Sequence, residues 1–473
     1  MMSATVASPG VVQELLPQAS SAPIWLVGGW VRDHVLQRET HDYDLVVDGD
    51  ALAIARRMAD AMAGDMYTLD ESRNIGRVLF HWHHMPITLD IAKLQSPTID
   101  EDLQRRDFSI NALAVDLRTG RLLDPTGGLQ DIRDRRLRIH NPDAFQEDPI
   151  RLLRAVRFAV QLGFRWSNET LAGLRVARPL LASVSPERIR DELFHILALH
   201  SACIALRLMA YEGLVEAVLP GLDDRDAAMD SSRSVVTARM CQLLNWLEVP
   251  RRDPAGSLLE AELLQLIGNR RTALADVLKR CNPSGRSVRD RLLLTAYVMG
   301  DADVHHPSSF RRLRQQASSI ARHLRLSRVE TVEIDQIITL VPAFDTFLEV
   351  KVEREQAAYR LCEQGGDALW MAFLLYLSRG MSGEDGVPNP QPDRLFFDSA
   401  ASLLEEVLDR CEAFHVKPLL DGKDIQQLLD ISAGREVGLL LHSLKQAQAL
   451  GKIVSLEDAR TYIKGLWKEH TTR

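Results

Sequence analysis

The sequence predicts an α+β protein in which a head of mixed strands and helices is followed by an all-α remainder. Up to about Ile139, short apolar runs of strand length alternate with segments of helical periodicity. After Asn141-Pro142, helical spacing dominates and strand-like runs become rare. Strands and helices in one segment, followed by helices alone, indicate a mixed domain with a separate helical part.

The elements of the head follow from local periodicity. Each expected strand is a short run rich in β-branched, aromatic or other apolar residues, and the runs lie at 24–27, 43–47, 76–82 and 86–92. A helix is expected over 50–63, where alanines and apolar residues recur at helical spacing.

The helical remainder carries its own start and stop signals. Helices are expected to begin at Asp148-Pro149 and at Ser185-Pro186, because each pair is a capping residue followed by proline at the first helical position. The polar stretch 223–234 and the Gly/Pro-rich stretch 379–394 are expected to be loops or domain joints.

A glycine turn after the first expected strand is the candidate phosphate site. Gly28 and Gly29 follow the apolar run, and a helix is expected to begin at Trp30. Glycines let the backbone approach a ligand closely, and the free N–H groups at a helix N-terminus attract anions. A Gly-Gly pair alone is usually only a turn, so the prediction depends on the residues that come next.

Asp42 and Asp44 come next, at the start of the second expected strand. Residues i and i+2 of a strand face the same way, so the two carboxylates should lie side by side. Such charges repel unless cations lie between them, which indicates a divalent metal site. Asp90, between apolar neighbours in a later strand, is the candidate third carboxylate, although strand alternation would equally point it to solvent. The combination predicts phosphoryl or nucleotidyl transfer with two metal ions.

Arg105, Arg106, Asp107 and Asn111 lie together in an otherwise apolar stretch. In the functional interpretation, the arginines bind phosphates and Asp107 or Asn111 binds the ribose hydroxyls. The alternative is a salt-bridged packing element.

A third segment, 147–158, suggests how a base is read. Asp148 and Arg151 lie one helical turn apart, as do Arg151 and Arg154, and Arg157 continues the series. A carboxylate that accepts from an exocyclic amine, beside a guanidinium that donates to the ring nitrogen, matches cytosine and adenine and rejects uracil and guanine. The alternative is that Asp148 is a plain helix cap.

Composition limits the classes of protein. The chain has 473 residues, of which 46% are hydrophobic, and a net charge of −8, which argues against a protein that coats nucleic acid non-specifically. The longest apolar run, 368–377, is about half a membrane span, and no positive charge precedes Arg32, so neither a membrane association nor a targeting signal is expected. The five cysteines show no metal-binding spacing and are expected to be reduced thiols of a cytoplasmic protein.

The motifs occur in a fixed order: VGGWVRD, DYD, LDIA, RRDFSINALA, LLDPTGGLQDI, EDPIRLLRAVRFA and PERIRDEL. This ordered set closely resembles the class II tRNA nucleotidyltransferases, which belong with bacterial poly(A) polymerases to the polymerase-β nucleotidyltransferase superfamily. The resemblance is dense over roughly 24–200 and returns weakly near 420–424 and 434–438.

The resemblance implies a polymerase-β-like head over 1–139, a neck over 140–200, a helical body over 201–345 and further body and tail over 346–473. It implies completion of the tRNA 3′-CCA end from CTP and ATP, with Mg²⁺ and without a nucleic-acid template. The tRNA acceptor stem would run along the helical body.

The resemblance also assigns roles to residues. It makes Asp42 and Asp44 the metal ligands and gives Asp148 and Arg151 the reading of CTP and ATP. The residues at the triphosphate and ribose would be Gly28, Gly29, Arg32, Arg105, Arg106 and Asp107.

One departure from the family's sequence pattern leaves open which nucleotides the enzyme adds. Only 14 residues, 91–104, separate Asp90 from Arg105, where CCA-adding members typically carry a longer flexible loop linked to the switch from CTP to ATP. We expect CCA addition, with the CC-adding subtype and a separate A-adding enzyme as the alternative. A poly(A) polymerase is disfavoured by the mixed charge of the C-terminal region, and an inactive tRNA-binding protein by the presence of all three carboxylates.

Overall fold

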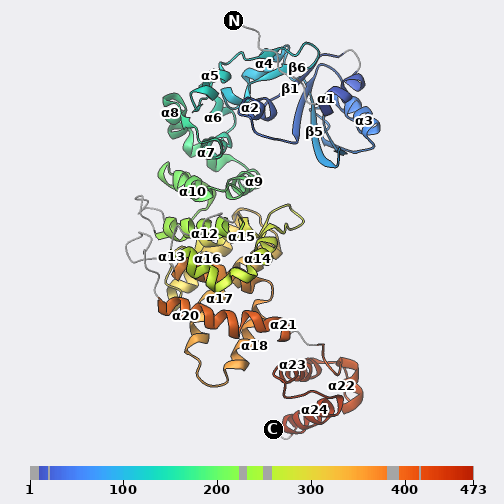
Figure 1. The fold of residues 1–473 in the computed structure, drawn as a ribbon, viewed down its shortest axis with the longest axis vertical. Helices are drawn as coiled ribbons and strands as arrows, with labels where there is room; N and C mark the ends of the chain where they lie inside the picture. The colour runs from blue at the N-terminus through green and yellow to red at the C-terminus, as the bar shows by residue number, and fades with distance from the viewer. Residues whose placement is uncertain are drawn as a thin grey trace. The chain divides into compact units, whose positions relative to one another are not determined.

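A computed structural model describes residues 10–19, 22–222, 232–248, 258–380, 394–414 and 417–471. The chain divides into two compact units, Met1–Ile196 with Glu212–Val218, and Leu197–Tyr211 with Leu219–Arg473 (Figure 1). The first unit contains both the expected head and the expected neck, and the four-part division remains a prediction. Of the two expected joints, residues 223–231 and 381–393 lie outside the described residues.

A seven-stranded mixed sheet forms the centre of the head. Its strands are β1 (Ile24–Val27), β2 (Asp42–Val47), β3 (Asp65–Asp70), β4 (Ile75–Trp82), β5 (Met85–Lys93), β6 (Ala114–Asp116) and β7 (Leu122–Leu123). The order across the sheet is β3-β4-β5-β2-β1-β6-β7, and β2 and β5 pair in parallel while the other neighbours are antiparallel. The four expected strands are confirmed to within a residue at each end. The sequence analysis missed β3, β6 and β7, because β3 is largely exposed and the other two are very short.

Five helices accompany this sheet in the described residues: α1 (Gly10–Leu15), α2 (Gly29–Val35), α3 (Ala51–Met62), α4 (Ile99–Gln104) and α5 (Gly128–Arg133). Helix α3, expected over 50–63, packs against β3, β4 and β5. Asp50 caps it by accepting a hydrogen bond from the Ala53 N–H. A Cβ on Gly76 of β4 would lie 3.1 Å from Ala55, so this glycine allows the helix to lie close to the sheet.

The rest of the first unit, which includes most of the expected neck, contains α6 (Ala144–Glu147), α7 (Arg151–Leu162), α8 (Asn168–Ala177), α9 (Pro186–Leu197), α11 (Val215–Val218) and a small parallel pair of strands, β8 (Arg136–Leu137) and β9 (Arg165–Trp166). Helix α9 begins at Pro186, as predicted. The prediction that a helix begins at Asp148-Pro149 is wrong, since α7 begins at Arg151. Asp148 has extended backbone and ends α6, and its carbonyl, not its carboxylate, accepts from the Arg151 N–H. The carboxylate is therefore not used as a helix cap.

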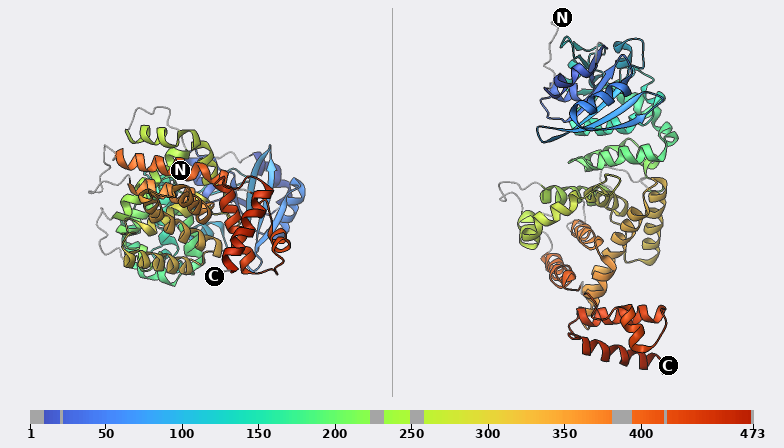
Figure 2. Two further views of the ribbon diagram at one scale, coloured as in Figure 1. Left: turned by 90° about the horizontal axis from the view of Figure 1, so that it is seen from below. Right: turned by 90° about the vertical axis from the view of Figure 1, so that its right-hand side faces the viewer.

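The second unit is helical throughout its described elements: α10 (Ala202–Tyr211), α12 (Ser232–Glu248), α13 (Leu258–Ile267), α14 (Arg271–Lys279), α15 (Val288–Met299), α16 (Pro307–His323), α17 (Arg328–Glu349), α18 (Arg354–Gly365), α19 (Ala368–Gly380), α20 (Arg394–Glu406), α21 (Cys411–Phe414), α22 (Gly422–Leu429), α23 (Arg435–Ala449) and α24 (Leu456–Thr471). Every residue of α15 is buried, and it contacts α12, α14, α16, α17 and α19. The last three helices, red in Figure 2, pack on one another around their own core, which includes Ile425, Leu444 and Ile463.

Two of the five cysteines differ from the expectation. Cys362 of α18 and Cys411 of α21 form a disulfide, whereas Cys203, Cys241 and Cys281 are free thiols. The pair is 49 residues apart, so nothing local in the sequence indicates that the two helices meet. Among the described helices, none has the length and apolarity that a membrane span needs.

Candidate active site

The glycine turn between β1 and α2 is shaped for close approach. Gly28 has φ +68°, a conformation that favours glycine, and a Cβ at this position would lie 2.7 Å from Nη1 of Arg106. Its N–H donates to the carbonyl of Leu113 at 3.0 Å. The absence of a side chain at Gly28 therefore allows the guanidinium of Arg106 to lie directly against the turn.

The two aspartates of β2 lie on one face, as strand alternation requires. Asp42 and Asp44 are exposed, while Tyr43 between them is buried. Asp44 pairs in register with Asp90 of the parallel neighbour β5. Solvent still reaches Asp44, but the protein atoms around it displace much of its hydration and raise the pKa of Asp44; the negative charges of Asp90 and Asp42 raise it further, against the opposing effect of Arg106. A cation placed between these carboxylates would relieve that repulsion, so Asp42 and Asp44 suit a divalent metal.

Asp90, the candidate third carboxylate, lies opposite Asp44 and is paired with an arginine. Both oxygens of Asp90 accept from Arg77, Oδ1 from Nε at 2.7 Å and Oδ2 from Nη2 at 2.8 Å. Within the described part of the chain, no group of three or more histidine, cysteine or acidic side chains is arranged to hold a metal ion.

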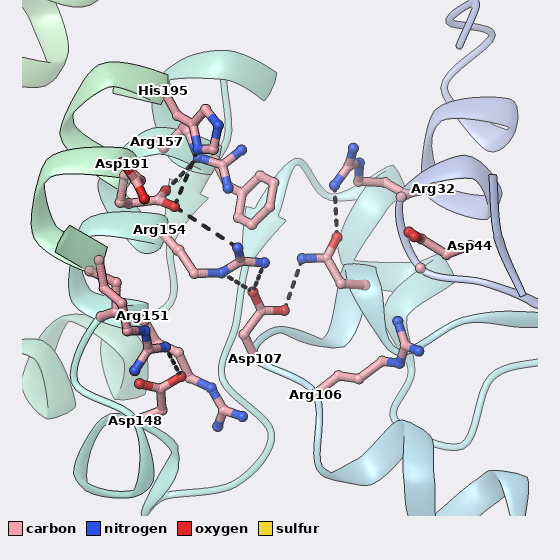
Figure 3. Close-up of a pocket in the computed structure, with 17 residues that line it drawn as sticks. Arg32, Asp44, Arg106, Asp107, Asp148, Arg151, Arg154, Arg157, Asp191 and His195 are labelled. Atoms are coloured by element: carbon pink, nitrogen blue, oxygen red, sulfur yellow. Dashed lines mark hydrogen bonds and ion pairs between the residues drawn. The ribbon is translucent and has the colours of Figure 1, made fainter. Parts of the chain in front are cut away.

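A continuous series of hydrogen bonds joins α2 to α7 (Figure 3). Arg32 Nη1 donates to Asn111 Oδ1 at 2.8 Å, and Asn111 Nδ2 donates to Asp107 Oδ1 at 2.9 Å. The other oxygen of Asp107 accepts from Arg154 Nε at 2.8 Å. Burial alone would raise the pKa of Asp107, but Arg154 and Asn111 outweigh it and lower the pKa, so this buried side chain stays ionised. Asp107 thus orients the arginines on both sides of the site.

Three guanidinium groups gather around the ring of Phe158. Those of Arg32, Arg154 and Arg157 lie 5.2, 5.3 and 4.3 Å from the ring centroid. The face of an aromatic ring attracts cations, which partly offsets their mutual repulsion. Arg157 also donates to Glu192 of α9. The result is a concentration of fixed positive charge suited to a polyphosphate.

The expected base-reading pair is held in place by protein partners. Asp148 Oδ2 accepts from Arg188 Nη2 of α9 at 2.8 Å. Arg151 donates to the carbonyls of Arg105 and Ala144, at 2.8 and 3.2 Å. Figure 3 shows both side chains at the neck side of the cavity, apart from Arg32 and Asp44.

One cavity of about 620 Å³ brings most of these residues together. Six arginines and five carboxylates line it, namely Arg32, Arg106, Arg151, Arg154, Arg157, Arg188, Asp44, Asp107, Asp148, Asp191 and Glu192. Gly28, Gly29 and Asn111, which are also expected nucleotide-binding residues, line it as well. Asp42, Asp90 and Arg105 are not among its lining residues. Arg105 instead lines a second cavity of about 680 Å³ with Ser96 and His140.

Sequence reasoning missed one face of α9. Arg188, Asp191, Glu192 and His195 all line the main cavity. They lie at positions i, i+3, i+4 and i+7 of α9, the first three of them within the PERIRDEL segment, so they share one helix face. That spacing is the signal that would have identified them.

A mixed sheet with a carboxylate pair on one strand, a glycine turn beside it and an arginine-rich cavity between head and neck defines a nucleotidyltransferase. Residues 24–138 match the family described as the poly A polymerase head domain, and residues 163–225 match the probable RNA and SrmB-binding site of polymerase A.

Comparison with known proteins narrows the class. The chain is 32% identical to the CC-adding tRNA nucleotidyltransferase of Geobacter sulfurreducens over 93% of this chain and 91% of that protein. It is 36% identical to the CC-adding tRNA nucleotidyltransferase of Synechocystis sp. over 94% and 93%, and 29% identical to the A-adding tRNA nucleotidyltransferase of Deinococcus radiodurans over 94% and 96%. A solved CCA-adding enzyme with ATP has the same fold, with a TM-score of 0.63 at 21% identity over 98% of this chain and 96% of that one. The chain therefore belongs to the tRNA nucleotidyltransferases.

Proposed function

We propose that this tRNA nucleotidyltransferase is of the CC-adding subtype, which transfers two cytidylates from CTP to the tRNA 3′ end and leaves the terminal A to a separate enzyme. We further propose that it works with Mg²⁺ in the cytoplasm. Full CCA addition, the expectation from the motifs, is the second candidate.

The connection between β5 and α4 carries this proposal. Strand β5 ends at Lys93 and α4 begins at Ile99, so the connection consists of the five residues Leu94–Thr98. The Leu94 N–H donates to Val47 O at 2.9 Å, and the Gln95 amide donates to the carbonyls of Arg73 and Lys93, each at 2.9 Å. The Thr98 hydroxyl caps α4. A segment this short and this well bonded leaves no flexible loop of the kind that, in CCA-adding relatives, is linked to the change from CTP to ATP.

The full-length relatives support the same choice. Two relatives that exceed 30% identity over nearly the whole chain are named CC-adding enzymes. The A-adding relative from Deinococcus is also similar over its full length, so the test below includes A addition as an outcome.

The proposed reaction uses three parts of the site. Asp42 and Asp44 would hold Mg²⁺, which lowers the pKa of the attacking tRNA 3′-hydroxyl and neutralises the triphosphate. Arg106 over the Gly28 turn and Arg32 beside Asn111 would bind the triphosphate oxygens, for which planar guanidinium groups are well suited. Arg154, fixed by Asp107, would keep the positive charge of the neck turned toward the same nucleotide.

Base selection would depend on Asp148 and Arg151. Arg188 occupies only Oδ2 of Asp148, and no other donor among the described residues reaches its Oδ1. That oxygen is free to accept from the exocyclic amine of cytosine, while Arg151 donates to the acceptor beside it. The same pattern also fits adenine, which is the observation that keeps CCA addition as the second candidate.

Transcripts of one tRNA that end at the discriminator base, at C and at CC test this proposal. Each is incubated with Mg²⁺ and CTP, ATP or both, and the 3′ ends are sequenced. Ends that stop at CC with both nucleotides, and a CC transcript that gains no A, support the proposal. Ends that read CCA establish the second candidate. Addition of A alone to the CC transcript, or long A tails, contradicts both.

The double variant Asp42→Asn/Asp44→Asn is the control for metal-dependent chemistry. We expect it to bind tRNA with unchanged affinity and to incorporate no nucleotide. Nucleotide incorporation by this variant would contradict the metal assignment.

A further inference from the structure

Arg77 of β4 lies at the catalytic edge of the sheet, although no motif includes it. Arg77 is directly opposite Asp90 on β5, and Asp90 is directly opposite Asp44 on β2. Residues opposite one another on neighbouring strands project from the same face of the sheet. Arg77, Asp90 and Asp44 therefore form a row across three strands.

Arg77 engages both oxygens of the Asp90 carboxylate. The two hydrogen bonds, at 2.7 and 2.8 Å, form a fork-to-fork pair. A divalent cation at Asp90 would have to share those oxygens with the guanidinium, whose positive charge repels it. The side chains are 41% and 24% exposed, so the pair forms in a solvent-accessible position and not because burial forces the charges together.

The positive charge of Arg77 also interacts with the carboxylates of Asp42 and Asp44. The hydrogen bond to Asp90 raises the pKa of Arg77, and the negative charges of Asp90, Asp42 and Asp44 raise it further against a smaller opposing effect of burial. The positive charge of Arg77 partly opposes the rise in the pKa of Asp44, as that of Arg106 does more strongly. The guanidinium groups of Arg77 and Arg106 thus both act on the aspartates, which is the charge arrangement expected around an anionic site.

From this row we infer that the guanidinium of Arg77 supplies the positive charge that a second metal ion would otherwise bring to the site. Asp90 is then not a metal ligand but a positioning residue, which holds Arg77 in place. The protein would then offer only Asp42 and Asp44 to a divalent ion. This inference rests on the proposed function and replaces the sequence-based expectation that Asp90 completes a three-carboxylate metal site.

The inference predicts that the site binds divalent cations weakly until a nucleotide supplies more oxygens. Arg77 neutralises Asp90 and reduces the negative potential at Asp42 and Asp44. Removing the guanidinium would free both oxygens of Asp90 and restore its charge beside Asp44. Metal affinity in the absence of nucleotide should therefore increase when Arg77 is lost.

Terbium luminescence on the full-length protein without nucleotide measures this affinity. Tyr43 lies between Asp42 and Asp44 in the chain, and its ring centroid is 6.3 Å from that of Trp30, so two aromatic side chains can sensitise an ion bound there. The luminescence from Tb³⁺ bound at this site is the part of the total signal that disappears in the Asp42→Asn/Asp44→Asn variant. Competition with Mg²⁺ then gives the affinity for the lighter ion.

We expect Arg77→Met to bind Tb³⁺ about tenfold more tightly than the wild type, the order of effect of one added unit charge near a partly solvated ion. The double variant Arg77→Met/Asp90→Asn should return to within about twofold of the wild type, since neither protein offers a third carboxylate. Arg314→Met is the matched control, because it breaks a comparable fork-to-fork pair with Asp335 on other helices, and it should change nothing.

A double variant that binds well below the wild type would overturn the inference, since Asp90 must then ligate the metal in the wild type. An affinity of Arg77→Met for Tb³⁺ equal to that of the wild type would overturn the inference as well. So would the absence, in both the wild type and Arg77→Met, of any luminescence that depends on Asp42 and Asp44. Thermal unfolding of each variant confirms that the fold is kept. The transcript assay reports on the proposed function separately, so failure of one leaves the other measurable.

Discussion

Replacing Gly28 by alanine should separate nucleotide binding from folding. The residue has φ +68°, and an alanine Cβ would lie 2.7 Å from Nη1 of Arg106. The atom that it meets is the end of a long flexible side chain, so Arg106 can move away. The backbone keeps its turn, but the guanidinium leaves the place where we expect the triphosphate.

The loss of folding stability and the loss of CTP affinity in Gly28→Ala can be estimated independently. A non-glycine residue in the left-handed region costs about 1–2 kcal/mol, of which the lower backbone entropy of unfolded alanine returns about half. Stability should therefore decrease by about 1 kcal/mol. Loss of a charge-assisted hydrogen bond from Arg106 costs about 1.5–3 kcal/mol of binding, so CTP affinity should weaken by roughly 10–100-fold.

Steady-state CTP incorporation into a tRNA transcript, together with thermal unfolding, measures both effects. The KM for CTP should rise while kcat changes little, because binding to the phosphates is lost equally in the ground and transition states. Gly163→Ala is the matched control. Gly163 has almost the same φ, +69°, but a Cβ there would meet no atom within 4 Å, and Gly163 does not line the main cavity. It should lose similar stability while its KM stays within about twofold of the wild type.

Two results would refute this reasoning. A KM for CTP in Gly28→Ala within about twofold of the wild type would show that Arg106 does not need its place over the turn. Equal rises in the KM for CTP in Gly28→Ala and Gly163→Ala would show that strain at a left-handed residue, and not the displacement of Arg106, weakens CTP binding.

Three further predictions concern base selection, pH and the disulfide. Asp148→Ala should lower kcat/KM for CTP by about 100-fold with little change for UTP, measured by competition between the two nucleotides, because the amine of cytosine loses its acceptor. Burial alone would raise the pKa of Glu330, but hydrogen bonds from Arg286 and Ser327 lower it from 4.5 to about 2. A depressed carboxyl pKa stabilises the fold above pH 4.5, so urea unfolding should show that the wild type loses about 3 kcal/mol relative to Glu330→Gln as the pH falls from 4.5 to 2. Cys362→Ser should lose about 4 kcal/mol of stability under oxidising conditions, the amount expected for a closed loop of this length, and should match the wild type once dithiothreitol is present.

The local parts of the fold could be predicted because their causes are local. Strands β1, β2, β4 and β5 and helix α3 each follow from the spacing of apolar residues within one segment. The same is true of the common face of Asp42 and Asp44, since a strand alternates whatever surrounds it. The error at Asp148 has the opposite cause. A capping signal was present, but Arg188, 40 residues later, holds the carboxylate in the folded chain.

The functional roles could be predicted only in part. Most of the expected nucleotide-binding residues do line one cavity, and the family comparisons agree with the motifs. Arg105 and Arg106 are neighbours in the chain but line different cavities, because consecutive side chains leave the backbone in different directions where α4 ends. No spacing rule distinguishes the two arginines.

The sequence by itself determined four strands of the head, helix α3, the glycine turn, the paired aspartates and the family. Only the tertiary structure decided which charges are neutralised. Arg32 pairs with its neighbour Asp33, but Arg154 meets Asp107 across 47 residues, Arg157 meets Glu192 across 35, and Arg77 meets Asp90 through the pairing of two strands. Pairs of this distant kind leave no sign in either segment, because Coulombic and hydrogen-bond energies depend on distance in space. The register of the sheet and the packing of α7 set those distances.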